Sequence, residues 1–453
     1  MGKRQAFGCV YSYSGRRVGG MISIILALSI LAAVPENVTE FDLSNGIHVI
    51  SRTVTGGEVE GVSFFLVGGS RVLDESNQGI EAFALEAAMT GSDTYPDERW
   101  REIMDYTRAS WNASYNYGYS RYHLKCLSED LPVLLDGFAD CLLEPQLDSE
   151  VVERVRNSQL VSLQAELEDP DNRIWFVANR GFMGAGHPFM LRPDGIPSTI
   201  ESFTGEDARR WLSDRVKSGN IVITHAGPTP PGELAAILET TFGRIPEGGD
   251  VLPPVPEFFI DGDTLVYEND ETLSAYCVVK FKAPPAGDED LPAYTTAMGV
   301  VDELLWQVLR TDNALTYAVS GGSTNSYRQN WGFMYISTTQ PVKSAELMVG
   351  VFRDVADGNV DQSLVTGIAN NNRTVQGISA QSMDSQCWML GNGYISAGDW
   401  RTSYMLQDSY EDLTVDEISR ALSDWAQDAG WGIIADSTIV DFSEFKPWSL
   451  KGE

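Results

Sequence analysis

Alternating apolar and polar positions divide the chain into short strands and amphipathic helices. The segments 47–53 and 59–67 are rich in β-branched and aromatic residues, which is typical of strands. The segments 111–117 and 121–127 alternate like two paired antiparallel strands. Helical periodicity predicts helices over 79–89, 97–108, 130–143, 149–167, 208–216 and 232–242, with a buried strand at 220–225.

The same succession restarts after a stretch rich in proline. Residues 245–258 contain Pro246, Pro253, Pro254 and Pro256 with glycines and little periodicity, a composition typical of a linker. Beyond it the pattern predicts strands over 274–281, 316–320 and 332–338 and helices over 293–309 and 344–355.

Two windows that lie 210 residues apart support an internal repeat. Residues 203–214 align with residues 413–424, and in both windows a threonine is followed by acidic residues and then by an apolar-periodic stretch. This is a helix-capping pattern. Each window continues to an apolar segment, at 221–223 and at 432–434. We interpret the two halves as copies of one α+β unit.

The N-terminal segment has the features of a targeting signal. A basic stretch precedes an unbroken apolar run over residues 21–34, which is shorter than the roughly 20 residues that span a bilayer. It fits the apolar region of a signal peptide, with Ala32 and Ala33 near a cleavage point, and Met21 is an alternative start. An uncleaved N-terminal anchor is the other interpretation. We therefore expect export to the periplasm or the extracellular space.

Composition narrows the class of protein further. Hydrophobic residues make up 43% of the chain, which allows well-packed cores. The 64 acidic residues against 32 basic ones give a net charge of −32, which argues against binding nucleic acid. This charge favours a highly solvated surface and is compatible with basic peptide ligands. No two cysteines form a CxxC pair, and the sequence leaves buried thiols and disulfides both open, although buried free cysteines are the commoner case.

Several landmarks occur in an order that resembles one peptidase family. They are the strand-like segment 43–50, the segment 67–71, the helical frame from Gly79 to Gly91, and the pair His187–Pro188. Over residues 40–445 the chain resembles the insulinase, pitrilysin and mitochondrial processing peptidase family. The resemblance implies an α+β fold of two repeated domains, each a mainly antiparallel sheet with helices on one face, which close into a clamshell.

The resemblance and the linker together set the expected domain boundaries. Residues 1–38 are the signal peptide or anchor, and residues 39–244 form the first peptidase-like domain. Residues 245–258 form the linker, and residues 259–453 form the second domain.

Active members of the family carry the motif H-x-x-E-H on the helix that begins near Gly79. Histidines at i and i+4 lie on one helical face and bind zinc, and the glutamate acts as general base toward the metal-bound water. Aligned on Gly79, this chain has Ala82 and Glu86 at the histidine positions and Leu85 at the base position. The third-ligand position, on a later helix, is Ser162.

No shift of the alignment restores the motif. Moving it by one residue would make Glu86 the base but would replace the histidines by Phe83 and Ala87. We therefore predict no metal, no cofactor and no catalytic residue of its own, and we assign none of the four histidines to a metal. They are His48, His123, His187 and His225.

A second family motif is retained. Arg310 and Tyr317 resemble the arginine–tyrosine pair of the family's second domain, which implies that they bind the substrate carbonyl and stabilise the developing oxyanion. The alternative is that Arg310 caps a helix and Tyr317 packs as a strand aromatic. One departure is that residues 301–306 replace the glycine-rich segment that many relatives carry.

These observations favour a catalytically deficient homologue that is not an enzyme on its own. The first hypothesis is a partner subunit of a heteromeric zinc peptidase, which binds a peptide or unfolded-protein substrate and contributes Arg310 and Tyr317 to a zinc-bearing paralogue. The alternative is a stand-alone peptide-binding or structural protein without a proteolytic role. A third hypothesis is an active peptidase with an unrecognised metal site.

Overall fold

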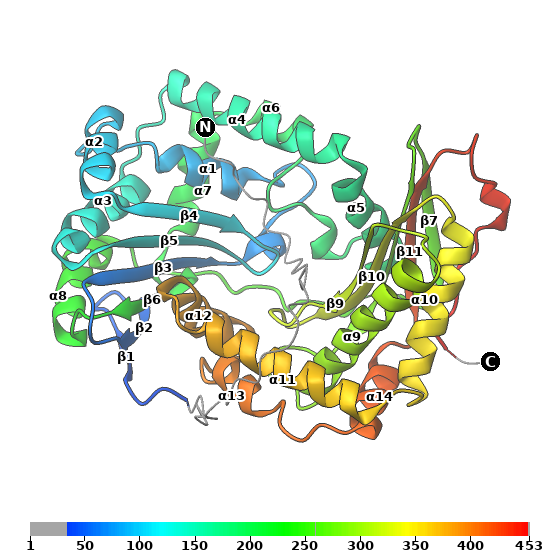
Figure 1. The fold of residues 1–453 in the computed structure, drawn as a ribbon. Coiled ribbons are helices and arrows are strands. Elements are labelled where there is room, and N and C mark those ends of the chain that lie inside the picture. The colour runs from blue at the N-terminus through cyan, green and yellow to red at the C-terminus, as the bar shows by residue number, and fades with distance from the viewer. Residues whose placement is uncertain (1–33, 259, 452–453) are drawn as a thin grey trace.

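A computed structural model describes residues 34–258 and 260–451 of the chain (Figure 1). The apolar run that we predict to be a signal peptide or anchor lies almost entirely outside these residues. Within the described part of the chain, no helix is long and apolar enough to cross a membrane.

The first half of the chain builds a six-stranded sheet. Its strands are β1 (Val38–Asp42), β2 (His48–Thr53), β3 (Val59–Val67), β4 (Ser110–Tyr115), β5 (Tyr119–Leu127) and β6 (Ile221–Gly227), in the spatial order β1-β2-β6-β3-β5-β4. All neighbouring strands are antiparallel except β2 and β6. Alternate residues such as Val62, Phe64 and Leu66 point into one buried core, as the period of two along a strand requires.

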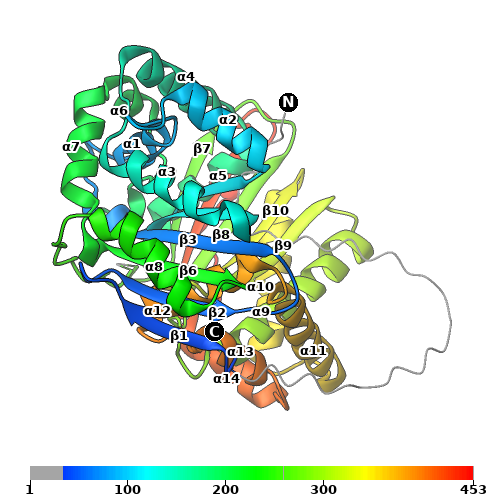
Figure 2. The ribbon, with the colours of Figure 1, turned by 90° about the vertical axis from the view of Figure 1, so that its left-hand side faces the viewer.

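Helices of the same half cover that face of the first sheet (Figure 2). They are α1 (Ile80–Ala88), α2 (Asp97–Thr107), α3 (Leu131–Leu143), α4 (Ser149–Glu168), α6 (Pro197–Ser202), α7 (Gly205–Arg215) and α8 (Pro231–Thr241). Apolar residues at helical spacing, such as Leu131, Leu134, Leu135 and Phe138 of α3, pack against the strands.

The second half builds a five-stranded sheet on a related plan. Its strands are β7 (Thr264–Asn269), β8 (Ala275–Ala283), β9 (Ala318–Ser323), β10 (Asn330–Thr338) and β11 (Ala429–Ala435), in the order β7-β11-β8-β10-β9. Only β7 and β11 are parallel. The helices α9 (Leu291–Leu305), α10 (Pro341–Ala356) and α14 (Val415–Trp425) cover one face. The predicted two-domain α+β fold is therefore confirmed.

The opposite face of each sheet is covered by a helix from the other half of the chain (Figure 1). Helix α5 (Pro170–Phe182) lies on the second sheet, where Ile174 and Ala178 contact Val278 and Ile434. Helix α12 (Met383–Ala397) lies on the first sheet, where Thr224 donates a hydrogen bond of 2.8 Å to the carbonyl of Cys387. This exchange covers both faces of each sheet. The sequence pattern did not predict it.

Glycines allow the exchanged helices to approach the sheets closely. A Cβ atom on Gly432 of β11 would lie 2.5 Å from the backbone nitrogen of Ala178, and one on Gly430 would lie 2.7 Å from that of Phe182. On the other side, a Cβ atom on Gly391 of α12 would lie 2.3 Å from the ring of Phe65. Glycine is therefore required where the backbone of one element touches another.

The remaining elements connect the two halves, and some boundaries differ from the prediction. Helices α11 (Gln362–Ser379) and α13 (Thr402–Asp408) flank α12. The helix predicted over 293–309 is α-helical only to Leu305 and continues as a π-helix over Trp306–Asp312. The four cysteines among the described residues are buried free thiols, which decides between the two alternatives that the sequence left open: Cys126, Cys141, Cys277 and Cys387.

Both halves of the predicted repeat contain a complete capping box. Thr204 and Asp207 bond reciprocally at the start of α7, and Thr414 and Glu417 do so at the start of α14. The amide of Glu417 donates to the Thr414 hydroxyl at 3.3 Å, and the Thr414 amide donates to the Glu417 carboxylate at 2.8 Å. These bonds satisfy amides that have no partner within the helix.

We expect Thr204→Ala and Thr414→Ala each to lower the free energy of unfolding by about 1 kcal/mol, because each leaves helix amides without an acceptor. Since the two caps lie in different halves, the effects should add in the double variant. Urea unfolding measures both. Thr240→Ala is the control, because the Thr240 hydroxyl bonds only to the carbonyl of Ile237 in its own helix. A loss at Thr240 equal to that at the caps would contradict the argument.

Candidate functional site

Helix α1 carries Ala82, Leu85 and Glu86, three of the four residues that we predict, from the family resemblance, to stand at the zinc-binding and general-base positions. Gly79 precedes it with a φ of 90°, a left-handed conformation that glycine adopts without strain. Ala82 is 1% exposed and Leu85 is fully buried, and Leu85 belongs to the core of the first half. Neither side chain has an atom that can bind a metal.

The other two positions carry oxygen atoms that point to separate surroundings. Glu86 is half-buried, and its charge contributes to raising the pKa of Tyr115, which burial and Tyr122 also raise. Ser162 lies on the exposed side of α4, and its hydroxyl donates to the carbonyl of Ser158 at 3.0 Å. Among the described residues, no group of three histidine, cysteine, aspartate or glutamate side chains could hold a metal ion.

The sequence pattern did not predict a buried carboxylate that lies beside the vacant motif. Glu81 is 3% exposed, accepts a hydrogen bond from the hydroxyl of Ser120, and lies 3.7 Å from Nε of Arg215. Burial raises the pKa of Glu81, and the charge of Arg215 opposes this shift. The signal in the sequence was a second acidic residue, besides Glu86, in a helix whose other residues are apolar. Arg215 also pairs with Asp250 of the proline-rich segment, so the network fixes α1 rather than offering a site to a ligand.

Arg310 and Tyr317 lie next to each other in the second half. Nη1 of Arg310 lies 3.4 Å from the carbonyl oxygen of Tyr317, and the guanidinium stacks on the Trp306 ring with its carbon 3.9 Å from the ring centroid. All three residues belong to the π-helix and the short loop that follows it. Such turns are frequent at functional sites.

The aromatic side chains of this group remain open to solvent. Tyr317 is 92% exposed and Trp306 is 40% exposed. The expectation that Tyr317 packs as a strand aromatic is therefore wrong, because it precedes β9 and contacts no core. We call Trp306, Arg310 and Tyr317 the arginine site.

The helix that carries the vacant zinc positions and the π-helix of the arginine site pack against different elements. Helix α1 packs against α3, α4, α6 and α7 of its own half. The π-helix packs against α9, α10 and β9 of the second half. Any chemistry that joins a zinc ion to Arg310 would therefore need a zinc site from elsewhere.

All four histidines have defined structural partners. His225 is fully buried between the hydroxyl of Ser51 and the carboxylate of Glu60, at 2.9 and 2.7 Å. His123 lies 3.0 Å from the Ser63 hydroxyl, and burial, helped by Arg121, lowers its pKa to about 4. Nε2 of His187 lies 3.1 Å from the carbonyl of Pro256. His48, on the rim of the first sheet, lies 2.8 Å from Asp42 and stacks on Tyr394.

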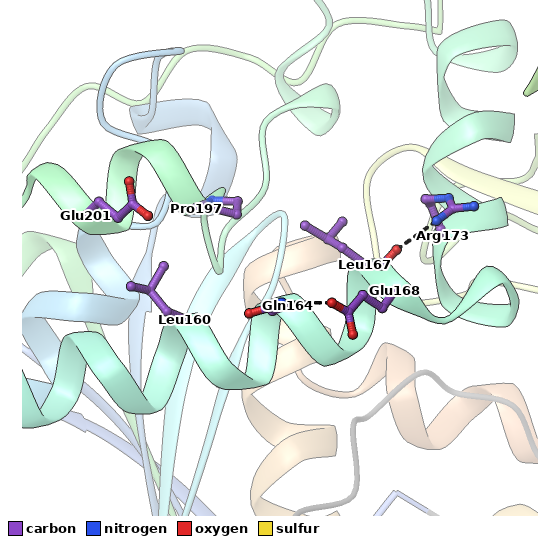
Figure 3. A pocket seen from close by; sticks show the side chains of 7 residues that line it. All are labelled: Leu160, Gln164, Leu167, Glu168, Arg173, Pro197 and Glu201. Atoms are coloured by element: carbon purple, nitrogen blue, oxygen red, sulfur yellow. Dashed lines mark hydrogen bonds between the residues drawn. The ribbon is translucent and has the colours of Figure 1, made fainter. Parts of the chain in front are cut away.

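A cavity of about 330 Å³ lies between α4, α5 and α6 (Figure 3). Its polar groups bond to their own neighbours: Gln164 donates to Glu168, and Arg173 donates to the carbonyl of Leu167. None of the four vacant motif positions lines it. The cavity is therefore not a remnant of the zinc site.

Two segments of this chain match domains of one peptidase family. Residues 49–175 match the family described as Insulinase (Peptidase family M16), and residues 202–372 match the Peptidase M16 inactive domain. The chain belongs to the insulinase family, peptidase family M16. Within that family it is a peptidase-like member that matches the domain described as inactive.

Individual relatives agree with this assignment. The mitochondrial-processing peptidase subunit beta of Saccharomyces cerevisiae is 23% identical over 68% of this chain and 70% of its own length. Subunit 1 of the cytochrome b-c1 complex of Bos taurus is 22% identical over 60% of this chain, which spans just over half (56%) of that protein. A solved peptidase M16 inactive domain from Pseudomonas fluorescens is 15% identical, with a TM-score of 0.77 over 88% of this chain and 98% of that one. The last comparison supports the fold alone.

Proposed function

We propose that this chain is the non-catalytic, peptide-binding subunit of a heteromeric zinc peptidase. The observation that carries the proposal is the contrast between the two halves. In the first, Ala82 and Leu85 are buried where metal chemistry would need donors. In the second, Arg310 is held against Trp306 and Tyr317 at the surface. A guanidinium fixed in one orientation is a strong donor to a carbonyl or oxyanion supplied from outside the chain.

The sheet edges provide a way to bind an extended peptide. Strand β4 is the last strand of the first sheet, and Asn112 and Ala113 on it are exposed. An open strand edge can pair with a peptide backbone. In the corresponding edge strand of the second sheet, β9, the amide of Gly321 already donates a 2.7 Å hydrogen bond to Asp302 of α9 and is not free to pair with a peptide. Peptide addition is therefore expected at β4.

Two relatives are named as subunits of larger enzymes, which supports a partner for this chain. The proposed partner is a paralogue that carries an intact H-x-x-E-H motif. We also propose that the chain works after export, as a periplasmic, extracellular or N-terminally anchored protein, because of the apolar run at residues 21–34. A stand-alone peptide-binding or assembly role is the competing outcome of the experiment below.

Co-expression with such a paralogue from the same organism tests the proposal. We expect the two chains to co-purify, and Arg310→Ala to lower peptide cleavage by the complex about 100-fold, the usual effect of losing one oxyanion donor. Arg310→Lys should restore little, because lysine lacks the planar group that stacks on Trp306. Arg209→Ala, an exposed arginine on α7, is the matched control.

The outcomes separate the hypotheses. Unchanged cleavage by an intact Arg310→Ala complex would exclude the contributed arginine site. Failure to co-purify, together with peptide binding by this chain alone, would favour the stand-alone role. Stoichiometric zinc and peptide cleavage by the isolated chain would overturn the proposal altogether.

A further inference from the structure

A lysine lies buried where α5 of the first half meets the second sheet. Lys280 is near the middle of β8 on the face that α5 covers, and it is only 3% exposed. Its side-chain nitrogen donates to the side-chain oxygen of Asn179 of α5 at 2.5 Å. Two tryptophan rings enclose it, with the nitrogen 5.5 Å from the centroid of Trp175 and 5.0 Å from that of Trp331.

No acidic group neutralises Lys280 among the described residues. On α5, Asp171 accepts from the hydroxyl of Tyr335, while Arg173 and Arg180 pair with Glu268 of β7. The residues opposite Lys280 on the neighbouring strands are Phe333 of β10 and Gly430 of β11. The next residue on the same face of β8 is Lys282, also a cation. A charged lysine here is stabilised only by one amide oxygen and two aromatic faces.

The surroundings of Lys280 join the two halves of the molecule. Asn179 also bonds to the hydroxyl of Tyr117, which lies in the turn between β4 and β5 of the first sheet. Tyr117 stacks on Phe189 and meets the edge of Trp331, the same ring that faces Lys280. The tip of β4, the helix α5 and the second sheet therefore meet around one titratable nitrogen.

We infer that Lys280 is a pH-dependent switch at the contact between the two halves. The neutral amine allows α5 and the β4–β5 turn to pack on the second sheet, and protonation of the amine weakens this packing. The inference does not depend on peptide binding or on a partner chain. It concerns a contact within this chain, so it can be tested on the isolated protein.

The direction of the pH effect follows from burial. Desolvation lowers the pKa of Lys280 from 10.5 to about 7 in the closed molecule. When α5 lifts away, the amine regains water and its ordinary affinity for protons, so the open state binds more protons between these two values. Closure is therefore favoured as the pH rises from 7 toward 10.5. Below about pH 6 the amine is charged in both states, and the equilibrium no longer changes.

Hydrogen exchange measures directly how often α5 opens from the second sheet. The amides of α5 and β8 are followed at pH 6, 7, 8 and 9 after correction for the intrinsic exchange rate, with α3 in the first core as internal reference. Protection of α5 and β8 should rise by roughly tens of fold between pH 7 and pH 9. Protection of α3 should change much less.

Variants at two lysines complete the test. Lys280→Met should remove the pH dependence and keep α5 protected at every pH, because methionine fills the space without a charge. Lys282→Met is the matched control on the same strand face and should keep the wild-type profile. If Lys280→Met did not fold, the pH dependence of protection in the wild-type protein would still test the inference. A wild-type protection factor that stays flat from pH 7 to 9, or a pH dependence retained by folded Lys280→Met, would overturn the inference.

Discussion

Replacing Gly432 by valine should detach α5 from the second sheet and lower the free energy of unfolding by at least about 3 kcal/mol, the upper range for overpacking a core. The added side chain would start 2.5 Å from the backbone nitrogen and 2.7 Å from the Cα atom of Ala178. Backbone atoms of a helix cannot rotate away as a side chain can, so α5 as a whole has to move. Urea unfolding and proteolysis within residues 170–182 should report the same change.

The matched control uses a glycine with free space around it. Gly367 lies inside α11, and nothing lies within 4 Å of the position that its Cβ atom would take. Gly367→Ala should be neutral or stabilise the protein by up to about 1 kcal/mol, because alanine favours a helix more than glycine does. If Gly432→Val unfolded in urea and was cleaved by protease like the wild-type protein, α5 would not be held by this contact.

Glu60→Ala should destabilise the first half by about 3–5 kcal/mol, the range found when one partner of a buried charged network is removed. Glu60 is fully buried, and its carboxylate accepts hydrogen bonds from His225, Thr229 and Ser128. Alanine would leave these donors buried without an acceptor. Thermal or urea unfolding gives the loss. Glu58→Ala, an exposed acid on the segment before β3, should change stability by less than about 0.5 kcal/mol.

The same network predicts an acid-sensitive part of the stability. Burial alone would raise the pKa of Glu60, but the hydrogen bonds from His225, Thr229 and Ser128 together lower it below its ordinary value of 4.5. Its contribution is therefore complete above about pH 4.5 and is lost as the pH falls through the lowered pKa. Glu60→Gln, which cannot ionise, should show a smaller loss of stability on acidification than the wild type. Identical acid profiles for the two proteins would contradict this origin.

Packing at α1 explains why a single substitution would not restore peptidase chemistry. Leu85, which we predict to stand at the general-base position, is fully buried in the first core. A glutamate there would lose its hydration without a positive partner, which is unfavourable by several kcal/mol. Ser162 lies on the exposed side of α4, with its hydroxyl bonded to its own helix. Restoring the motif would therefore require changes to the core packing around Leu85 as well as to the exposed side of α4.

The elements that depend on local periodicity could be read from the sequence. The strand β3 occupies the predicted segment 59–67, and α1, α3 and α4 begin and end within one or two residues of their predictions. Both capping boxes of the repeat are present as their threonine and acidic residues predicted. The vacant zinc positions stay a prediction from the sequence, which rests on residue type, because alanine and leucine have no donor atom.

Contacts between distant segments could not be read in this way. The exchanged helices α5 and α12 were not predicted, because a sequence pattern shows that a face is apolar and not which segment covers it. Glu60 meets His225 and Lys280 meets Asn179 across separations of more than 100 residues. The sequence by itself determined the paired capping boxes and the family resemblance, and it predicts the loss of the zinc ligands. Only the tertiary structure decided how the halves hold each other, since that depends on which buried polar and backbone groups meet when the chain closes.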